Sequence, residues 1–234
     1  MEAGRSLLIP IGLTLFLLAV DAAVCVGMVS SMISFLHHNG RGPFMVDLPE
    51  GRSFWLAGEP VNLVTDPAHT TLAAGGTTLI LVGLGGSIAL WLERRARKKW
   101  DQYSSAFYIW SLIALLSWLF TTGALIYTFV ETEKTGGQTI NLFIARMIPP
   151  LARYPGRWTP ENWYAAVLDL PLAFEGQRRI IEGNLTIMRS WRWNLVAQFV
   201  LGSVLLTLLA LEHLRIRRSA LLAPFDRVMS SEKP

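Results

Sequence analysis

The sequence predicts an all-α integral membrane protein, a four-helix transmembrane bundle with two outer loops, the second of which carries short amphipathic helices. The first observation is four long apolar stretches, because about 20 helical residues cross the hydrocarbon core of a bilayer. The second is composition: hydrophobic residues make up 52% of the chain and charged residues only 16%. Such a balance excludes a disordered chain and argues against an ordinary soluble domain. We therefore expect residues 1–234 to form one membrane domain.

The four expected spans differ in their boundaries and in their interruptions. The first, residues 7–36, is longer than the apolar region of a secretory signal and is interrupted by Asp21, so we expect it to be retained. The other three are expected at residues 72–92, 106–130 and 194–214.

Basic residues beside the apolar stretches predict the orientation of the chain. Residues 94–99 form a basic run in the loop 93–105, and Arg215, Arg217 and Arg218 open the tail 215–234. The positive-inside rule places both segments, and hence both termini, in the cytoplasm. Loops 37–71 and 131–193 then lie on the lumenal or extracellular side. The net charge of +4 is divided among these membrane ends, so the expected partner is the lipid bilayer with its anionic headgroups and no nucleic acid is expected.

Tryptophans mark the expected membrane edges. Amphipathic aromatic rings collect at the headgroup level, so we interpret those near the ends of the spans as interfacial anchors. They are Trp91, Trp100, Trp110, Trp191 and Trp193. Trp118 lies in the middle of the third span and is set apart from this group.

The two outer loops show local signals of structure. Prolines and glycines in loop 37–71 separate short apolar runs at 44–46 and 53–56, which suit turns or a small hairpin. In loop 131–193, Thr159 and Pro160 begin an amphipathic helix that Pro171 ends, and a second amphipathic segment is expected at about 172–190. The single cysteine, Cys25, lies in the first span, so no intrachain disulfide joins the loops.

Small residues predict where helices approach one another closely. A four-residue spacing of small side chains lets two backbones meet in lipid. We predict helix packing at Ala19, Ala23, Gly27 and Ser31 of the first span and at Gly75, Gly83 and Ser87 of the second. The two stripes could meet within one chain or between two copies of it.

Asp21 is the candidate catalytic residue, because a carboxyl near the bilayer midplane costs about 3 kcal/mol and is treated as functional by default. The other spans offer no cation at a matching depth. We therefore expect a protonated carboxyl or a hydrogen bond to one of the polar residues of the third and fourth spans. These are Ser117, Thr121, Thr122, Gln198 and Thr207. A structural hydrogen bond, a proton or cation path, and contact with a partner helix or ligand all stay open as roles.

Two further patterns lie in the outer loops. His37, His38 and His69 fall at the outer ends of the first two spans and are weak candidates for a metal site, with polar interface residues as the simpler interpretation. Asn184-Leu185-Thr186 is an N-glycosylation sequon, close before the fourth span. We expect no cofactor, since the chain has no phosphate-cradling loop, zinc-protease motif or nucleophile elbow.

The predicted topology is similar to the general plan of claudin-type and tetraspanin-type membrane organisers. The outer-loop cysteines and the Cys-Cys-Gly signature of those families are absent, and we assign no family. Our first hypothesis is a non-enzymatic membrane organiser or accessory subunit that acts through its outer loops on a membrane-protein partner or a second copy of itself. The alternatives are a small membrane enzyme acting on a lipophilic substrate and a proton or ion pathway in an oligomer using Asp21.

Overall fold

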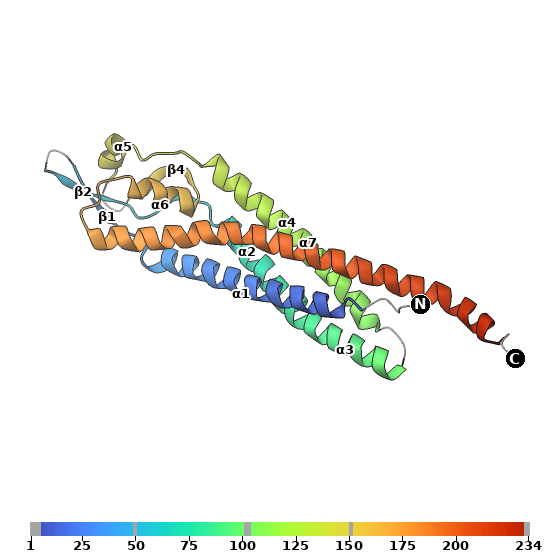
Figure 1. The fold of residues 1–234 in the computed structure, drawn as a ribbon. Coiled ribbons are helices and arrows are strands. Elements are labelled where there is room, and N and C mark those ends of the chain that lie inside the picture. Colours follow the sequence, from blue (N-terminus) through green and yellow to red (C-terminus); the bar gives the residue numbers. More distant parts are fainter. Residues whose placement is uncertain (1–5, 49–50, 101–103, 150–151, 232–234) are drawn as a thin grey trace. The chain divides into compact units, whose positions relative to one another are not determined.

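A computed structural model (Figure 1) describes residues 6–48, 51–100, 104–149 and 152–231, excluding the side chains of residues 99–100 and 219–231. The chain is 75% helical. Within these described residues, four helical segments are long and apolar enough to cross a membrane: Leu8–His38, Asp66–Lys98, Ser105–Lys134 and Glu175–Arg218. The expected helical class, with four segments long and apolar enough to cross a membrane, is therefore confirmed at this level.

The spans extend beyond the apolar stretches that predicted them. The first is helix α1 (Leu8–His38), and the third is α4 (Ser105–Lys134). The second is divided into α2 (Asp66–Thr77), a π-helical segment η1 (Thr78–Leu84) and α3 (Gly85–Trp100). The fourth is α7 (Glu175–Ser231), which also takes in most of the segment predicted at 172–190. That segment and the fourth span are one helix, because the buried apolar face continues from Ile181 through Met188 to Leu195.

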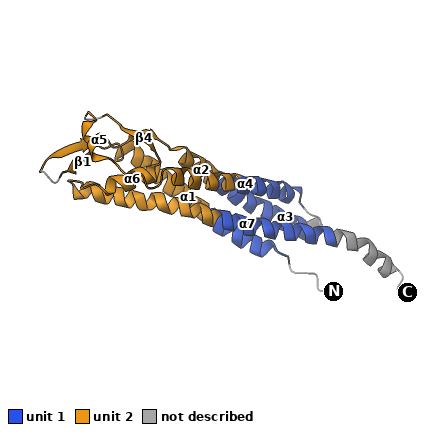
Figure 2. Ribbon diagram, turned by 90° about the horizontal axis from the view of Figure 1, so that it is seen from above, with its two compact units in different colours: residues 1–20, 77–119, 199–234 blue, residues 21–76, 120–198 orange. Residues whose placement is uncertain are grey.

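The chain forms two compact units, shown in blue and orange in Figure 2. Unit 1 contains residues 1–20, 77–119 and 199–234, and unit 2 contains residues 21–76 and 120–198. Each unit has its own buried apolar cluster. In unit 1 this cluster includes Leu15, Val82, Phe107 and Leu205, contributed by α1, η1, α4 and α7.

Trp110 belongs to the core of unit 1. Its side chain is only 3% exposed, and its indole nitrogen donates to the backbone oxygen of Val82 in η1 at 3.1 Å. The Trp110 ring occupies the space that a side chain at position 86 would need. The predicted anchor role is therefore wrong for Trp110, because a buried carbonyl satisfies its polar end.

The remaining tryptophans differ from one another in the same way. Trp91 and Trp193 are 56% and 59% exposed, as an interfacial anchor requires, but Trp191 is buried, so its predicted anchor role is also wrong. Trp118 donates to Phe199 O and Ser203 Oγ of α7 at 3.3 and 3.1 Å. The side chain of Trp100 lies outside the described residues.

Unit 2 carries four short strands and two short helices between the spans, which we call the loop module. Strands β1 (Phe44–Asp47) and β2 (Ser53–Leu56) pair antiparallel, which confirms the predicted hairpin. Strand β3 (Pro60–Leu63), from the first inter-span segment, pairs parallel with β4 (Tyr154–Trp158), from the second. The module also contains α5 (Leu142–Met147) and α6 (Pro160–Leu168), and α6 starts at the predicted proline.

Helix α6 is the centre of the loop module. Its side chains Trp163 and Tyr164 are fully buried, and each donates one hydrogen bond to the first inter-span segment. Trp163 Nε1 donates to Gly58 O at 2.7 Å, and Tyr164 Oη donates to Gly40 O at 2.9 Å. Burial raises the pKa of Tyr164, so the phenol keeps the proton that it donates.

An ion pair joins α6 to the start of α7 within unit 2. Glu161 Oε1 lies 3.0 Å from Arg192 Nη2 and 3.8 Å from Arg189 Nε. Burial raises the pKa of Glu161, against the opposing effect of the two guanidiniums. Burial therefore disfavours the charged form of Glu161, and the two arginines offset part of that cost.

The close fit of Trp110 on Gly86 predicts a cost for a single methyl group. A Cβ at position 86 would lie 2.5 Å from Trp110 Cζ2 and 2.8 Å from Leu15 Cδ2. We expect Gly86→Ala to lower the free energy of unfolding by about 1–3 kcal/mol. Thermal unfolding of the purified protein in detergent measures this loss.

Gly76→Ala is the matched control, since nothing lies within 4 Å of a Cβ there. Alanine is the better helix former by up to about 1 kcal/mol, so this variant should be as stable as the parent or more stable. Equal melting temperatures for the two variants would contradict the packing described for Trp110.

Candidate functional site

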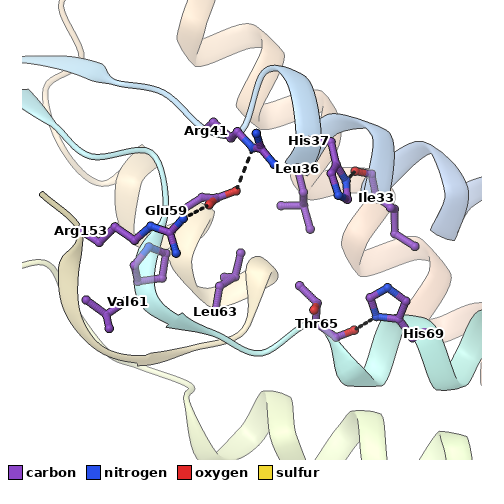
Figure 3. Close-up of a pocket in the computed structure, with 11 residues that line it drawn as sticks. Ile33, Leu36, His37, Arg41, Glu59, Val61, Leu63, Thr65, His69 and Arg153 are labelled. Carbon is purple, nitrogen blue, oxygen red and sulfur yellow. Dashed lines mark hydrogen bonds and ion pairs between the residues drawn. The ribbon is translucent and has the colours of Figure 1, made fainter. Parts of the chain in front are cut away.

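A pocket of about 300 Å³ lies in unit 2, where α1 ends and α2 begins (Figure 3). It is lined by two arginines, one carboxylate and two histidines, together with apolar side chains. The lining residues are Ile33, Leu36, His37, Arg41, Glu59, Pro60, Val61, Leu63, Thr65, His69 and Arg153. A mixed apolar and charged surface of this size is typical of a ligand pocket.

Two hydrogen bonds from α6 hold the charged wall of the pocket in place. Tyr164 fixes the carbonyl of Gly40, which precedes Arg41, and Trp163 fixes the carbonyl of Gly58, which precedes Glu59. Gly58 also lies directly against the backbone of Arg41, in a space that no Cβ could occupy. The backbone segments that carry Arg41 and Glu59 are therefore held side by side.

The parallel strand pair brings the second arginine to the same wall. Pro60 of β3 is in register with Tyr154 of β4, so the residues that precede them, Glu59 and Arg153, are neighbours. Arg153 Nη2 lies 3.5 Å from Glu59 Oε2, and Arg41 Nε lies 3.9 Å from Glu59 Oε1. Figure 3 shows Glu59 between the two guanidiniums. One carboxylate thus serves two cations.

Two of the three predicted histidines line this pocket. His37 Nδ1 bonds to Ile33 O at 2.8 Å and His69 Nδ1 bonds to Thr65 O at 3.0 Å. His38 bonds to Ser34 O in the same way and does not line the pocket. In the described part of the chain, no group of three or more histidine, cysteine or acidic residues could hold a metal ion. The structure therefore brings His37 and His69 to one pocket without forming a metal cluster there.

Asp21 is bonded to a residue that the sequence did not indicate. Asn194 Nδ2 of α7 donates to Asp21 Oδ1 at 2.6 Å, within unit 2. The remaining oxygens, Asp21 Oδ2 and Asn194 Oδ1, are buried without a hydrogen-bond partner among the described residues. Both of these oxygens accept hydrogen bonds. A protonated carboxyl supplies the O–H donor that two facing acceptors lack. The geometry is that of a hydrogen bond between helices, and the role of Asp21 stays a prediction.

The predicted packing residues occupy different surroundings. In unit 1, a Cβ on Gly83 would lie 3.0 Å from Ala19 Cβ, and Ser87 Oγ donates to Gly83 O. In unit 2, Gly75 faces α1, and a Cβ at position 75 would lie 3.2 Å from Val26 Cγ2. Ala23, Gly27 and Ser31 are exposed, and α1 instead buries Ala22, Cys25 and Val29. A packing role for the three exposed residues stays a prediction.

The sequon residue Asn184 lies within helix α7. Its side-chain amide donates to Ile180 O at 2.8 Å, one helical turn earlier. The sequon is thus part of a continuous helix and not of a loop, where acceptor sites usually lie. Glycosylation of Asn184 stays a prediction.

A buried charge cluster in unit 1 was missed by the sequence analysis. Glu93 of α3 and Glu212 of α7 have fully buried side chains, and Arg97 lies 2.7 Å from a carboxylate oxygen of each. Glu93 also accepts from Ser104 N, and Glu212 accepts from Leu7 N. The i, i+4 spacing of Glu93 and Arg97 was a visible signal, but Arg97 was interpreted only as part of the basic run 94–99.

Comparison with known proteins adds no family to this description. No protein family, no curated protein and no solved structure matches the chain. The functional argument therefore depends on the residues themselves.

Replacement of Asp21 separates its possible roles. Asp21→Asn keeps an acceptor for Asn194 Nδ2 and adds a donor, so a structural role predicts a melting temperature and a phenotype close to those of the parent. Asn194→Leu removes the donor, and we expect a loss of about 1–2 kcal/mol, the upper range for hydrogen bonds between helices in membranes. Thermal unfolding and complementation of a deletion strain measure both variants.

Thr207→Val serves as the control on α7, since Thr207 is exposed and bonds only to Ser203 O of its own helix among the described contacts. A stable Asp21→Asn protein without function would reject a purely structural role and favour proton transfer at Asp21.

Proposed function

We propose that this protein is a multi-pass membrane organiser or accessory subunit, built as a four-helix transmembrane bundle and acting through its loop module. In this proposal both termini are cytoplasmic, and the loop module lies on the lumenal or extracellular side. Its partner is another membrane protein, with a second copy of the chain as the other candidate.

The observation that carries the proposal is the folding of the two inter-span segments into one module. Strands β3 and β4 come from different segments, and the two hydrogen bonds of Trp163 and Tyr164 join the same segments. Asp47 N also donates to Pro171 O at 2.8 Å. Simple connections between spans need no shared core, whereas a surface that binds a partner must keep its shape. An ordered core supports a binding role for this module.

Exposed apolar side chains mark the surface that best fits a partner. Phe143 and Met147 of α5 are 70% and 72% exposed, and Trp55 of the adjacent strand β2 is 46% exposed. Arg146 lies on the same short helix. Aromatic residues, methionine and arginine are enriched in the centres of protein interfaces, and this composition favours a protein partner.

The proposed orientation predicts a labelling pattern. Cys25 is the only cysteine and is buried, so Cys25→Ala gives a background without thiols. In that background, Gln138→Cys, in the exposed segment between α4 and α5, should react with a membrane-impermeant maleimide on intact cells or sealed vesicles of outside-out orientation. Arg95→Cys in α3 should react only after permeabilisation. The reverse pattern would contradict cytoplasmic termini.

The proposed contact surface predicts the loss of a partner. We expect Phe143→Gln combined with Met147→Gln to reduce a stoichiometric partner in affinity purification by about tenfold or more, because an interface anchor contributes about 2 kcal/mol. Arg179→Gln on α7, whose side chain is 77% exposed and lies outside this surface, is the control and should keep most of the partner. The yield and melting temperature of the double variant should equal those of the parent, since both side chains are exposed. Full retention of the partner by the double variant would reject this surface.

The pocket beside His37 and His69 is the observation that favours the alternative, a small membrane enzyme acting on a lipophilic substrate. In that case the purified particle should carry no stoichiometric partner, and the pocket histidines would supply proton transfer. The proton or ion pathway rests on Asp21 alone, and the Asp21→Asn variant tests it.

A further inference from the structure

We propose that the pocket between the end of α1, strand β3 and the start of α2 binds the phosphate headgroup of an anionic lipid. Arg41 and Arg153 hold the phosphate oxygens, and the histidine side of the pocket receives the hydroxyl groups of the headgroup. This inference goes beyond the proposed function, because it concerns a small-molecule site and not the surface of Phe143 and Met147.

The charges of the pocket favour an anion. Two guanidiniums face one carboxylate, so these three side chains together carry one net positive charge. The contacts of Glu59 with Arg153 and Arg41, at 3.5 and 3.9 Å, are longer than direct charge-assisted hydrogen bonds of about 2.7–2.9 Å. Each guanidinium has five N–H donors in a planar fork that matches a phosphate group. In the described part of the chain, Glu59 is the only carboxylate paired with either arginine.

The position and the apolar wall of the pocket favour a lipid over a soluble phosphate. Ile33 and Leu36 come from the last turns of α1, where its long apolar stretch ends, and Val61 and Leu63 come from β3. The side chain of Val61 is 53% exposed. Headgroups lie at this level of a bilayer, with the start of the acyl chains beside them. Apolar side chains next to two arginines therefore fit a phosphate that continues into a lipid tail.

The histidines define the other side of the pocket, across from Glu59 (Figure 3). A backbone carbonyl only accepts hydrogen bonds, so Nδ1 of His37 and of His69 carries the proton that each donates. In the neutral ring Nε2 is then an acceptor. Donors on the arginine side and acceptors on the histidine side fit a phosphodiester with a hydroxylated headgroup, such as phosphoglycerol.

The test measures lipid binding to the purified full-length protein by native mass spectrometry, with short-chain phosphatidylglycerol as the probe and phosphatidylcholine as the zwitterionic comparison. We expect Arg41→Gln combined with Arg153→Gln to weaken phosphatidylglycerol binding by about tenfold or more, since each arginine near an anionic lipid contributes about a kcal/mol. Arg52→Gln combined with Arg146→Gln removes two exposed charges outside the pocket and should change binding less than about twofold by the same reasoning. Equal losses in the two double variants would overturn the site.

Glu59→Gln gives the opposite expectation and guards against misfolding as an explanation. It removes the competing carboxylate with little change of shape, so phosphatidylglycerol should bind several-fold more tightly. Unchanged or weaker binding by a folded Glu59→Gln protein would overturn the proposal. A partly unfolded variant would not bind more tightly.

Competition with glycerol 3-phosphate distinguishes the lipid from a free phosphate ester. A lipid site predicts that millimolar glycerol 3-phosphate leaves phosphatidylglycerol binding nearly unchanged, because it lacks the acyl chains. Displacement at equal concentrations would overturn the lipid assignment and identify the ligand as a soluble phosphate ester. The result is independent of partner capture, which depends on Phe143 and Met147.

Discussion

The arrangement of the loop module depends on two hydrogen bonds donated by neighbouring residues of α6. Trp163 and Tyr164 are fully buried, so their N–H and O–H donors cannot bond to solvent. An unpaired buried donor costs about 1–3 kcal/mol, so each ring is held where a carbonyl can receive it. Those carbonyls belong to Gly58 and Gly40, on different strand connections of the first inter-span segment. One short helix therefore fixes the positions of two turns that are separated in the sequence. These turns carry Arg41 and Glu59, which form the charged wall of the pocket.

The charged groups of the molecule follow a related rule. Glu93 and Glu212 are fully buried in unit 1, and they are tolerated because Arg97 bonds to both and backbone N–H groups of Ser104 and Leu7 satisfy further oxygens. Removing one member of such a buried pair costs about 3–5 kcal/mol, much more than breaking a surface pair. In the pocket of unit 2 the arrangement differs, since Arg41 and Arg153 are largely exposed and share the one carboxylate of Glu59. In the first arrangement all four carboxylate oxygens have partners, and in the second two exposed guanidiniums share one carboxylate.

Features set by short stretches of sequence were predictable, and features set by distant pairings were not. The β1–β2 hairpin and the start of α6 follow from nearby prolines and glycines. The parallel pairing of β3 with β4 joins segments separated by two spans, and no local pattern reports it. Asn194, the partner of Asp21, is the first residue of the predicted fourth span. In the structure it lies well inside a helix that begins at Glu175, and the apolar pattern does not indicate this. Trp110 was assigned to a membrane edge because its fit on Gly86 is visible only once α3 and α4 are packed.

The loop module holds its shape without a covalent crosslink, since the only cysteine of the chain is buried in α1. Small extracellular modules commonly depend on disulfides, and these form only where the surroundings are oxidising. Here aromatic packing and backbone pairing supply the order instead. The module can therefore mature without oxidants or disulfide isomerases and withstand reductants, so expression hosts with a reducing interior are as suitable as secretory ones.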